Sequence, residues 1–452
     1  MTKLLKSLWA RFLFQDRGIL PTKKLLIVYV ILTAALGIAT AGNLSWWYVF
    51  TINIIVFLVS LGDLFFSPKK SQLSFKRTLS DEMERGLPYS LTIEVSNPSA
   101  YSFSYRLIDS LPQSFSRPFP IKGTIPKDSA VKIMYETTAA ERGKYKINKL
   151  YFRYRSLLGL WEKQTTVELP QEVKVIPDLT ETKQYLENAQ AFLLYEGWKI
   201  RKQLSGVGEF AKIRNYVVGD DPRKINWRQT AKLREVMTNE YEPEHGKYIT
   251  ILLDCGRMMG AELKKANRLE KALEAALTVA AAALQKGDYV SVLAFSKEIK
   301  VFVPPAKGMA HLQTILQAIY NVKVDAAESN YAAVLQYLEM VQKKRSLLLL
   351  FSDVRTFLHE ESALIYLKRL RSRHLFFMIG IEDQTLVKRT KAEPTDVQTA
   401  MIKSIAQQQM MFKKREKNKW EKQGLQMIEA PEEKLAVTAV SQYIDIMNQN
   451  LL

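Results

Sequence analysis

Two long apolar runs near the N-terminus constrain this chain more than any other feature. Residues 25–42 read LLIVYVILTAALGIATAG without a charge, and residues 46–66 read WWYVFTINIIVFLVSLGDLFF, with Asp63 as the one charged residue. A helix needs about 20 apolar residues to cross the ~30 Å hydrocarbon core of a bilayer. A signal peptide would begin its apolar stretch nearer the N-terminus and would not be followed by a second run. The sequence therefore predicts two transmembrane helices over residues 25–68.

Basic residues flank this hairpin on both sides, whereas the link between the runs is uncharged. They are Lys3, Lys6, Arg11, Arg17, Lys23 and Lys24 before it, and Lys69, Lys70, Lys76 and Arg77 after it. By the positive-inside rule, both termini and the large C-terminal region face the cytoplasm from a two-pass position in the cell (inner) membrane. Residues 1–24 are predicted to form a basic amphipathic segment on the inner leaflet. A positively charged leader is the alternative.

The net charge of +19 over 452 residues indicates a negatively charged partner. Nucleic acid and anionic lipid are the usual candidates. The membrane flanks account for much of the excess, and a nucleic-acid surface would interleave several aromatic residues with basic ones. We therefore expect the lipid bilayer as a partner and no nucleic acid.

Residues 71–177 show the period-two pattern of antiparallel strands. The stretches YSLTIEVSN, FSYRLIDS, AVKIMYETT and KLYFRYRS alternate apolar and polar residues between turn signals. Short alternating strands at this spacing are typical of a β-sandwich. We predict an Ig-like β-sandwich domain that serves as a scaffold or interaction module.

Strand and helix patterns alternate over residues 248–452. The apolar stretches YITILLD, YVSVLAF, SLLLLFSD and HLFFMIG are separated by helical segments. Continuous apolar strands between helices indicate a parallel sheet covered on both faces, in a doubly wound α/β domain. Ligands of such sheets bind at the carboxyl ends of the strands. A helical insertion at about 394–423 ends in a basic cluster.

The intervening residues 178–247 contain a linker helix and a distinctive segment, GVGEFAKIRNYVVGDDPRKINWRQTAK. This segment resembles the signature of the domain of unknown function 58 family, prokaryotic proteins that join it to a von Willebrand factor type A-like domain. The resemblance therefore also implies that fold for residues 248–452. The residues that carry the signature are Gly208, Glu209, Phe210, Arg214, Tyr216, Gly219, Asp220, Asp221, Pro222, Arg223, Asn226, Trp227 and Arg228.

The signature has a physical interpretation of its own. Asp220 and Asp221 stand ahead of a proline and are suited to cap a turn, and nearby arginines are close enough in sequence to pair with them. We interpret the segment as a structural clasp between the β-module and the α/β domain, with Trp227 buried as a core residue. The alternative is a docking surface on which Arg223 and Arg228 bind a phosphate or a partner's carboxylate.

The von Willebrand factor type A resemblance also implies an ion site, built from an Asp-x-Ser-x-Ser loop, a threonine and a second aspartate. Here the first loop reads DCGRMM, so Asp254 is kept but Gly256 and Met258 replace both serines. Asn330 stands in the threonine position and Asp353 is kept. Oxygen ligands from three loops suit Mg²⁺, but this motif is degenerate. We expect no cofactor and keep a Mg²⁺ site at Asp254, Asn330 and Asp353 as an alternative.

Other interpretations of the same loops stay open. Asp254 and Asp353 are suited to cap the strand ends, and Arg257 and Arg355 are candidates to replace the charge of the cation. Cys255 beside Asp254 invites a nucleophile interpretation, but no histidine is near it in sequence and a buried small residue is the simpler expectation.

The resemblance implies a membrane-anchored, cytoplasm-facing adaptor that works with a MoxR-type AAA+ ATPase in assembly, chaperone-like or stress-related roles. The alternative is a hydrolase-like enzyme, or a metal-dependent binding protein, that uses the loops of Asp254 and Asp353. A hydrolase would need a base and an oxyanion site that the sequence does not supply. We therefore expect a protein-binding rather than a catalytic function.

Overall fold

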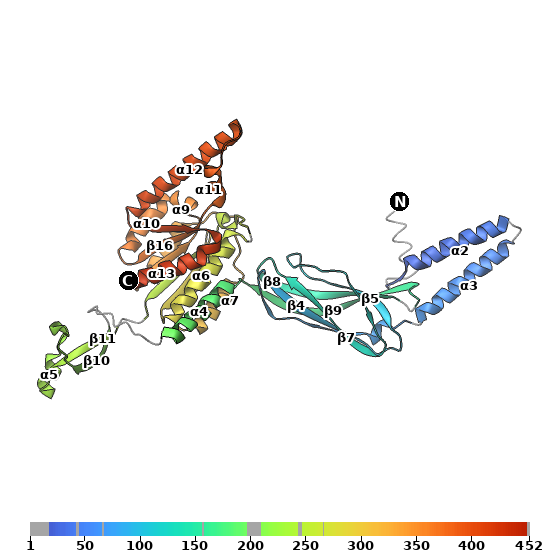
Figure 1. Cartoon of the computed structure of the whole chain (residues 1–452), viewed down its shortest axis with the longest axis horizontal. Helices are drawn as coiled ribbons and strands as arrows, with labels where there is room; N and C mark the ends of the chain where they lie inside the picture. Colours follow the sequence, from blue (N-terminus) through green and yellow to red (C-terminus); the bar gives the residue numbers. More distant parts are fainter. Residues whose placement is uncertain are drawn as a thin grey trace. The chain divides into compact units, whose positions relative to one another are not determined.

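The computed structural model describes residues 18–41, 45–65, 67–155, 158–196, 209–242, 246–264 and 266–449. The chain divides into two compact units, Met1–Ile176 and Pro177–Leu452 (Figure 1). Most of the basic segment predicted over residues 1–24 lies outside the described residues. Within that range, Ile19–Pro21 forms a short strand, β1, which pairs with β9 (Trp161–Ile176). The sequence pattern did not predict this strand.

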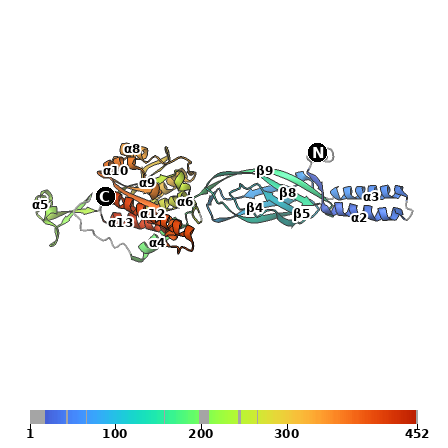
Figure 2. The same cartoon turned by 90° about the horizontal axis from the view of Figure 1, so that it is seen from above.

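Two apolar helices lie side by side in the first unit, α2 (Lys23–Ala41) and α3 (Trp46–Phe65) (Figures 1 and 2). Their apolar side chains are largely exposed, as for Ile38 (76%) and Trp47 (80%). Among the described residues, one helical stretch, Trp46–Gln72, is long and apolar enough to cross a membrane. The structure thus supports one candidate span where the sequence predicted two.

The charged residue of the second apolar run fixes the end of α3. The Asp63 carboxylate is buried and accepts hydrogen bonds from the backbone N–H groups of Leu158 (2.9 Å) and Leu160 (3.2 Å). The indole N–H of Trp161 donates to the Ser60 carbonyl at 2.8 Å. A buried carboxylate needs such donors, so Asp63 is a structural anchor for the β8–β9 loop.

Two sheets make up the rest of the first unit. One has the order β1-β9-β8-β5-β6 with β3 beside β9, and the other has the order β2-β4-β7. Leu91, Ile93 and Val95 alternate along β4 and are fully buried, in one cluster with Phe152 and Tyr154 of β8. The predicted period-two pattern is therefore confirmed, and the two sheets share a core. The strands are β2 (Ser74–Thr78), β3 (Glu82–Glu84), β4 (Pro88–Asn97), β5 (Phe103–Asp109), β6 (Ile121–Ile125), β7 (Ser129–Thr138), β8 (Gly143–Arg155) and β9 (Trp161–Ile176).

A six-stranded sheet, ordered β14-β13-β12-β15-β16-β17, is the centre of the second unit. Its neighbours pair in parallel except β13 and β14, which are antiparallel. The prediction of a parallel sheet was wrong at this edge because the link between β13 and β14 is too short for a crossover. The strands are β12 (Tyr248–Asp254), β13 (Tyr289–Phe295), β14 (Ile299–Ala306), β15 (Ser346–Phe351), β16 (Leu375–Ile381) and β17 (Gln426–Ala430).

Helices cover both faces of this sheet, as the apolar strands predicted. The helices α6, α7 and α13 lie over one face, and α8, α9 and α10 pack with Trp420 of α12 on the other (Figure 2). The helix α4 packs on α6. The bounds are α4 (Thr180–Glu196), α6 (Arg268–Gln285), α7 (Ala310–Ile319), α8 (Tyr331–Val341), α9 (Val354–Leu358), α10 (Glu361–Arg371), α11 (Gln384–Lys391), α12 (Val397–Glu421) and α13 (Leu435–Asn448), with the short helices η3 (Arg257–Gly260) and η4 (Glu432–Lys434).

The signature segment forms a small module of its own. The strands β10 (Glu209–Asn215) and β11 (Met237–Glu242) pair as an antiparallel ladder, and η2 (Pro222–Lys224) and α5 (Trp227–Leu233) lie in the connection between them. Gly208 of the predicted signature lies outside the described residues.

Candidate functional site

The carboxyl edge of the second unit's sheet brings the predicted ion-site residues Asp254 and Asp353 together. Asp254 ends β12 and is 2% exposed. Its carboxylate accepts hydrogen bonds from the Gly256 N–H (2.8 Å), the Tyr331 hydroxyl (2.7 Å), the Ser352 hydroxyl (2.5 Å) and the Ser329 hydroxyl. Both oxygens are therefore used by donors of the protein itself.

The absence of a side chain at Gly256 leaves room for a hydroxyl group that takes the place of the missing loop serine. A side chain at this position would clash with the Ser329 hydroxyl, which occupies the space beside the Asp254 carboxylate. The hydroxyl thus comes from the loop before α8 and not from the loop after β12. Met258, at the second serine position, is 37% exposed and lies in η3.

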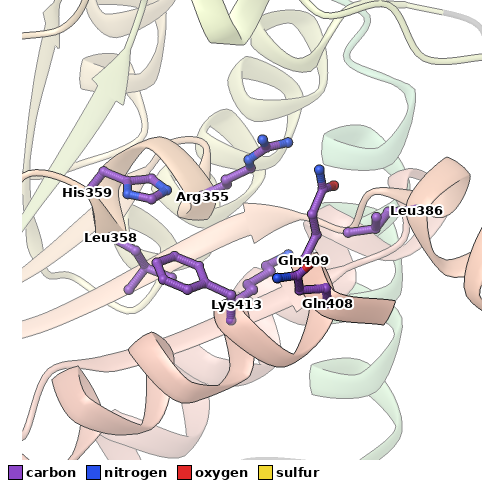
Figure 3. A pocket seen from close by; sticks show the side chains of 8 residues that line it. Arg355, Leu358, His359, Leu386, Gln408, Gln409 and Lys413 are labelled. Carbon is purple, nitrogen blue, oxygen red and sulfur yellow. The ribbon is translucent and has the colours of Figure 1, made fainter. Parts of the chain in front are cut away.

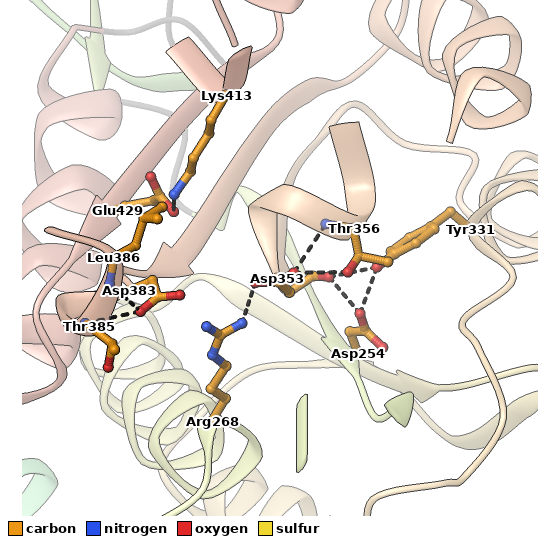
Figure 4. Close-up of polar contacts among 11 residues, drawn as sticks. Asp254, Arg268, Tyr331, Asp353, Thr356, Asp383, Thr385, Leu386, Lys413 and Glu429 are labelled. Atoms are coloured by element: carbon orange, nitrogen blue, oxygen red, sulfur yellow. Dashed lines mark hydrogen bonds and ion pairs between the residues drawn. The ribbon is translucent and has the colours of Figure 1, made fainter. Parts of the chain in front are cut away.

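Asp353 has an equally complete set of partners. One oxygen forms an ion pair with the Arg268 guanidinium, and the other accepts from the Thr356 N–H (3.0 Å) and hydroxyl (2.8 Å) (Figure 4). Both members of the ion pair are largely buried, with 12% of the Arg268 side chain and 7% of the Asp353 side chain exposed. Arg268 is the first residue of α6, which begins at this edge, so the fold brings a cation to the second aspartate.

The two arginines expected to supply that charge lie elsewhere. Arg257 forms an exposed ion pair with Glu328 at 2.9 Å, and Arg355 points from α9 into a separate pocket (Figure 3). The prediction for Arg257 and Arg355 is therefore corrected to Arg268. No local pattern in the sequence marks Arg268, because it is distant from both loops.

The third predicted ligand also caps a helix. The Asn330 side-chain oxygen accepts from the Ala333 N–H at 3.0 Å, at the start of α8. With the oxygens of Asp254 and Asp353 engaged as well, this arrangement does not fit the octahedral oxygen shell that Mg²⁺ requires. Among the described residues, no three His, Cys, Asp or Glu side chains form a group able to hold a metal.

Burial controls the chemistry of this edge. The pKa of Tyr331 is raised well above its ordinary value, because burial and the neighbouring Asp254 carboxylate disfavour the tyrosinate. Tyr331 therefore stays protonated and donates its hydrogen bond.

Cys255 is fully buried, and its thiol lies 3.5 Å from the Leu253 carbonyl. It is the small buried residue expected from the sequence, and a substrate cannot reach it.

A pocket of about 310 Å³ lies beside this edge, between α9, α11 and α12 (Figure 3). We call it the α9–α12 pocket. The His359 ring stacks on Phe412 with centroids 5.5 Å apart, and Lys413 pairs with Glu429 of β17 (Figure 4). Its walls are formed by Arg355, Leu358, His359, Leu386, Gln408, Gln409, Phe412 and Lys413. The sequence predicts a helix here with several apolar residues partly on one side and a basic end, but it does not predict the pocket.

The signature module contains the Asp-capped turn that the sequence predicted. Asp220 forms a two-point ion pair with Arg214 (2.7 and 2.8 Å) and accepts from the Val217 N–H (2.9 Å). Asp221 caps η2 through the Arg223 N–H at 3.0 Å.

The module's other signature side chains close its turns. The Asn226 side chain caps α5 by accepting from the Gln229 N–H at 3.1 Å, and the Tyr216 hydroxyl donates to the Asp220 carbonyl at 3.1 Å. Gly219 takes a φ of 110°, which favours glycine. Arg223 is the second residue of η2 and Arg228 is the second residue of α5, so each follows directly after a capped helix start.

One prediction for the module was wrong. Trp227 was expected to be a buried core residue, but it is 70% exposed, and Val218 is 96% exposed. The reason is the size of the module, since a hairpin with one short helix has little interior in which to bury an indole.

Three comparisons with known proteins bear on this arrangement. Residues 212–424 match the family described as "Protein of unknown function DUF58". The "Uncharacterized protein YeaD" of Bacillus subtilis (strain 168) is 23% identical over 327 residues, which cover 68% of this chain and 77% of that protein.

Two of the matching solved structures are distant relatives in sequence. The conserved hypothetical protein BatB from Bacteroides thetaiotaomicron is matched at 15% identity and a TM-score of 0.31, over 45% of this chain and 100% of that one. A FixG-related protein from Vibrio parahaemolyticus is matched at 9% identity and a TM-score of 0.18, over 23% of this chain and 96% of that one. Neither score supports an argument about the fold.

The DUF58 match begins inside the signature module and ends just after α12. It therefore includes Asp254, Arg268 and Asp353 of the carboxyl edge as well as the α9–α12 pocket. The match agrees with the resemblance inferred from the signature over residues 212–424.

Proposed function

We propose that this protein is a membrane-anchored, cytoplasm-facing adaptor that binds protein partners without a metal ion and works with a MoxR-type AAA+ ATPase in assembly, chaperone-like or stress-related roles. In this proposal α2 and α3 form a two-pass hairpin, the two sheets of the first unit form an Ig-like sandwich, and the α/β sheet has a von Willebrand factor type A-like fold. The family resemblance supplies the expected partner.

The ion pair between Arg268 and Asp353 carries this proposal. In an ion-dependent site, a divalent cation would bridge the two aspartates and a partner's carboxylate. Here the charge of Asp353 is balanced internally, and Asp254 is held by three hydroxyls. A partner must therefore bind through side chains of the surrounding surface.

The test is a pull-down of the tagged, detergent-solubilised full chain from its native membranes, with and without Mg²⁺-ATP. The edge variant is Asp353→Asn with Arg268→Met, which removes both charges of the buried pair. Arg257→Ala is the matched control, because its ion pair is exposed. We expect all three proteins to recover a MoxR-type ATPase.

Loss of the ATPase from the edge variant alone, with an unchanged melting temperature, would contradict metal-free docking. Failure of the unmodified protein to recover any ATPase of this class would contradict the adaptor proposal itself.

A further inference from the structure

One side of α12 is apolar and exposed. Residues four apart lie on the same side of a helix, so Val397, Met401 and Ile405 line up along its N-terminal half and Phe412 continues the row after Gln408. Met411 lies at its border. We call these five apolar residues the α12 face; their exposed fractions run from 47% for Phe412 to 79% for Val397. The opposite side of α12 is the one packed against the unit, through Ala406 and Trp420.

The α12 face runs into the α9–α12 pocket. Phe412 belongs to both, and Gln408 lies between Ile405 and Phe412 on the same side of the helix. Figure 3 shows the side chains of Gln408 and Gln409 near the side chain of Lys413 at the pocket wall. An exposed apolar row that ends in a hollow of about 310 Å³ is the shape of a helix-binding groove.

Basic side chains lie beside the groove. Residues 384–421 contain nine basic and four acidic side chains. Lys414 and Arg415 are exposed next to Met411, and Arg355 contributes from α9. Some of the basic residues pair within the protein, as Lys413 does with Glu429. The remaining charge favours an acidic ligand.

We infer that the α12 face and the α9–α12 pocket bind an acidic amphipathic helix of a partner protein, with one apolar side chain seated in the pocket against Phe412 and His359. The inference rests on the proposed adaptor function, and it specifies the chemistry of the partner. A helical ligand matches the row of apolar residues, and its carboxylates match the basic rim. The exposed Met401 and Met411 suit such a surface because methionine adapts to varied apolar partners.

A membrane surface would satisfy the same charge but not the same shape. The pocket is walled by three helical elements, α9, α11 and α12, so it offers a hollow for a side chain and two carboxamides for hydrogen bonds. A helix bound in a groove seats individual apolar side chains in hollows of this kind. These features favour a protein ligand.

The probe is a fluorescent designed peptide of about 16 residues, with leucines at helical spacing and glutamates on the other side. It is titrated against the full chain in detergent, together with a peptide of the same composition in scrambled order. We expect saturable binding of the ordered peptide that weakens from about 50 mM to about 300 mM salt, and much weaker binding of the scrambled one. Equal binding of both peptides would overturn the inference.

The variant Met401→Glu with Ile405→Glu adds repulsive charges to the α12 face. Both positions are exposed in a helix that tolerates glutamate, so the fold should be kept. We expect the affinity for the ordered peptide to fall about tenfold or more. Val437→Glu on α13 is the matched control, because Val437 is also an exposed apolar residue of a helix (67%). An equal loss in the control would contradict the assignment.

A cysteine at position 405 separates a protein ligand from a membrane. Cys255 is the one native cysteine and is buried, so Ile405→Cys gives one accessible thiol for maleimide labelling. Protection by the acidic peptide in zwitterionic nanodiscs supports the inference. Protection that depends on anionic lipid and not on the peptide would assign the surface to the membrane instead.

Failure of this inference is distinguishable from failure of the adaptor proposal. If the unmodified protein recovers the ATPase and the Met401→Glu, Ile405→Glu variant recovers it equally, the adaptor role stands and the docking surface is elsewhere. If the ordered peptide binds as expected but no ATPase is recovered, the groove stands and the ATPase partnership fails.

Discussion

Two neighbouring regions of the α/β unit use their side chains in opposite ways. At the carboxyl edge, Asp254 and Asp353 are buried and their oxygens are held by hydroxyls, backbone N–H groups and Arg268. On helix α12 of the same unit, the α12 face leaves apolar side chains such as Met401 and Val397 exposed to solvent. At the carboxyl edge, the protein's own groups occupy the carboxylate oxygens. On the α12 face, the apolar side chains are accessible to a partner.

This difference separates the position of a residue in a sequence motif from its use in the folded chain. A carboxylate that accepts four hydrogen bonds has little left to offer a ligand, however suggestive its position in the sequence. A contiguous exposed apolar patch lowers the solubility of a protein. On proteins that stay soluble, such a patch marks a site where a partner binds. The α12 face is therefore better suited to bind a partner than the two aspartates are.

The largest expected effect is on the closed edge. Asp254→Ala would leave the Tyr331 and Ser352 hydroxyls buried without their acceptor, so we expect a loss of about 3 kcal/mol in unfolding free energy. Asn330→Ala removes one helix cap and should cost about 1 kcal/mol. Thermal unfolding of the two variants in detergent measures both losses. Equal, small losses would contradict a structural role for Asp254.

The second prediction concerns whether the Arg268 guanidinium balances the charge of Asp353 in place of a metal ion. Breaking a buried ion pair costs roughly 3–5 kcal/mol; because Arg268→Met leaves the Thr356 hydrogen bonds to Asp353 in place and the pair is partly exposed, we expect a loss at or below the lower end of that range, about 2 to 3 kcal/mol. The unmodified protein should melt at the same temperature with Mg²⁺ and with EDTA. Stabilisation of the unmodified protein by Mg²⁺, measured in the same melts, would show that the edge still binds an ion.

A smaller, local effect is expected in the signature module. Asp220→Ala removes the Arg214 ion pair and the Val217 hydrogen bond together, whereas Asp221→Ala removes only the cap on η2. We expect severalfold faster amide hydrogen exchange around Val217 in the first variant and a lesser change in the second. The rest of the α/β unit serves as the internal reference, and its exchange should stay unchanged. Similar exchange at Val217 in both variants would contradict the central role of Asp220.

The smallest expected effect is a pH dependence at His374. Burial, with Arg373 and Arg345 nearby, lowers the pKa of His374 below its ordinary value of 6.5. The unfolded chain then binds the proton more readily, so stability is lost as the pH falls below about 6.5 towards the lowered folded pKa. His374→Gln should reduce this slope. An unchanged slope in His374→Gln would assign the effect to other groups.

The sequence predicted most of the α/β elements because their patterns are local. The apolar strands from Tyr248 to Ile381 and the amphipathic helices between them need only periodicity to be recognised. The reversed direction of β14 was missed, because a strand's pattern does not contain its direction. The strand β1 was missed because three residues are too few for a period.

The candidate site was less predictable, for a physical reason. Its partners come from four separate segments, so Ser329, Tyr331 and Arg268 meet Asp254 and Asp353 only in the folded chain. Ser329 and Tyr331 do flank the predicted Asn330, and that clustering was the one available signal. The exposure of Trp227 depends on how little interior the module has, which the segment's composition does not reveal.

Metal-free docking on the α12 face is tested by comparing capture of a MoxR-type ATPase by three full-length proteins in detergent. They are the unmodified chain, the edge variant Asp353→Asn with Arg268→Met, and the face variant Met401→Glu with Ile405→Glu. We predict that the ATPase is recovered with the first two and lost with the third. Recovery with the face variant and loss with the edge variant, both folded by thermal melting, would contradict it.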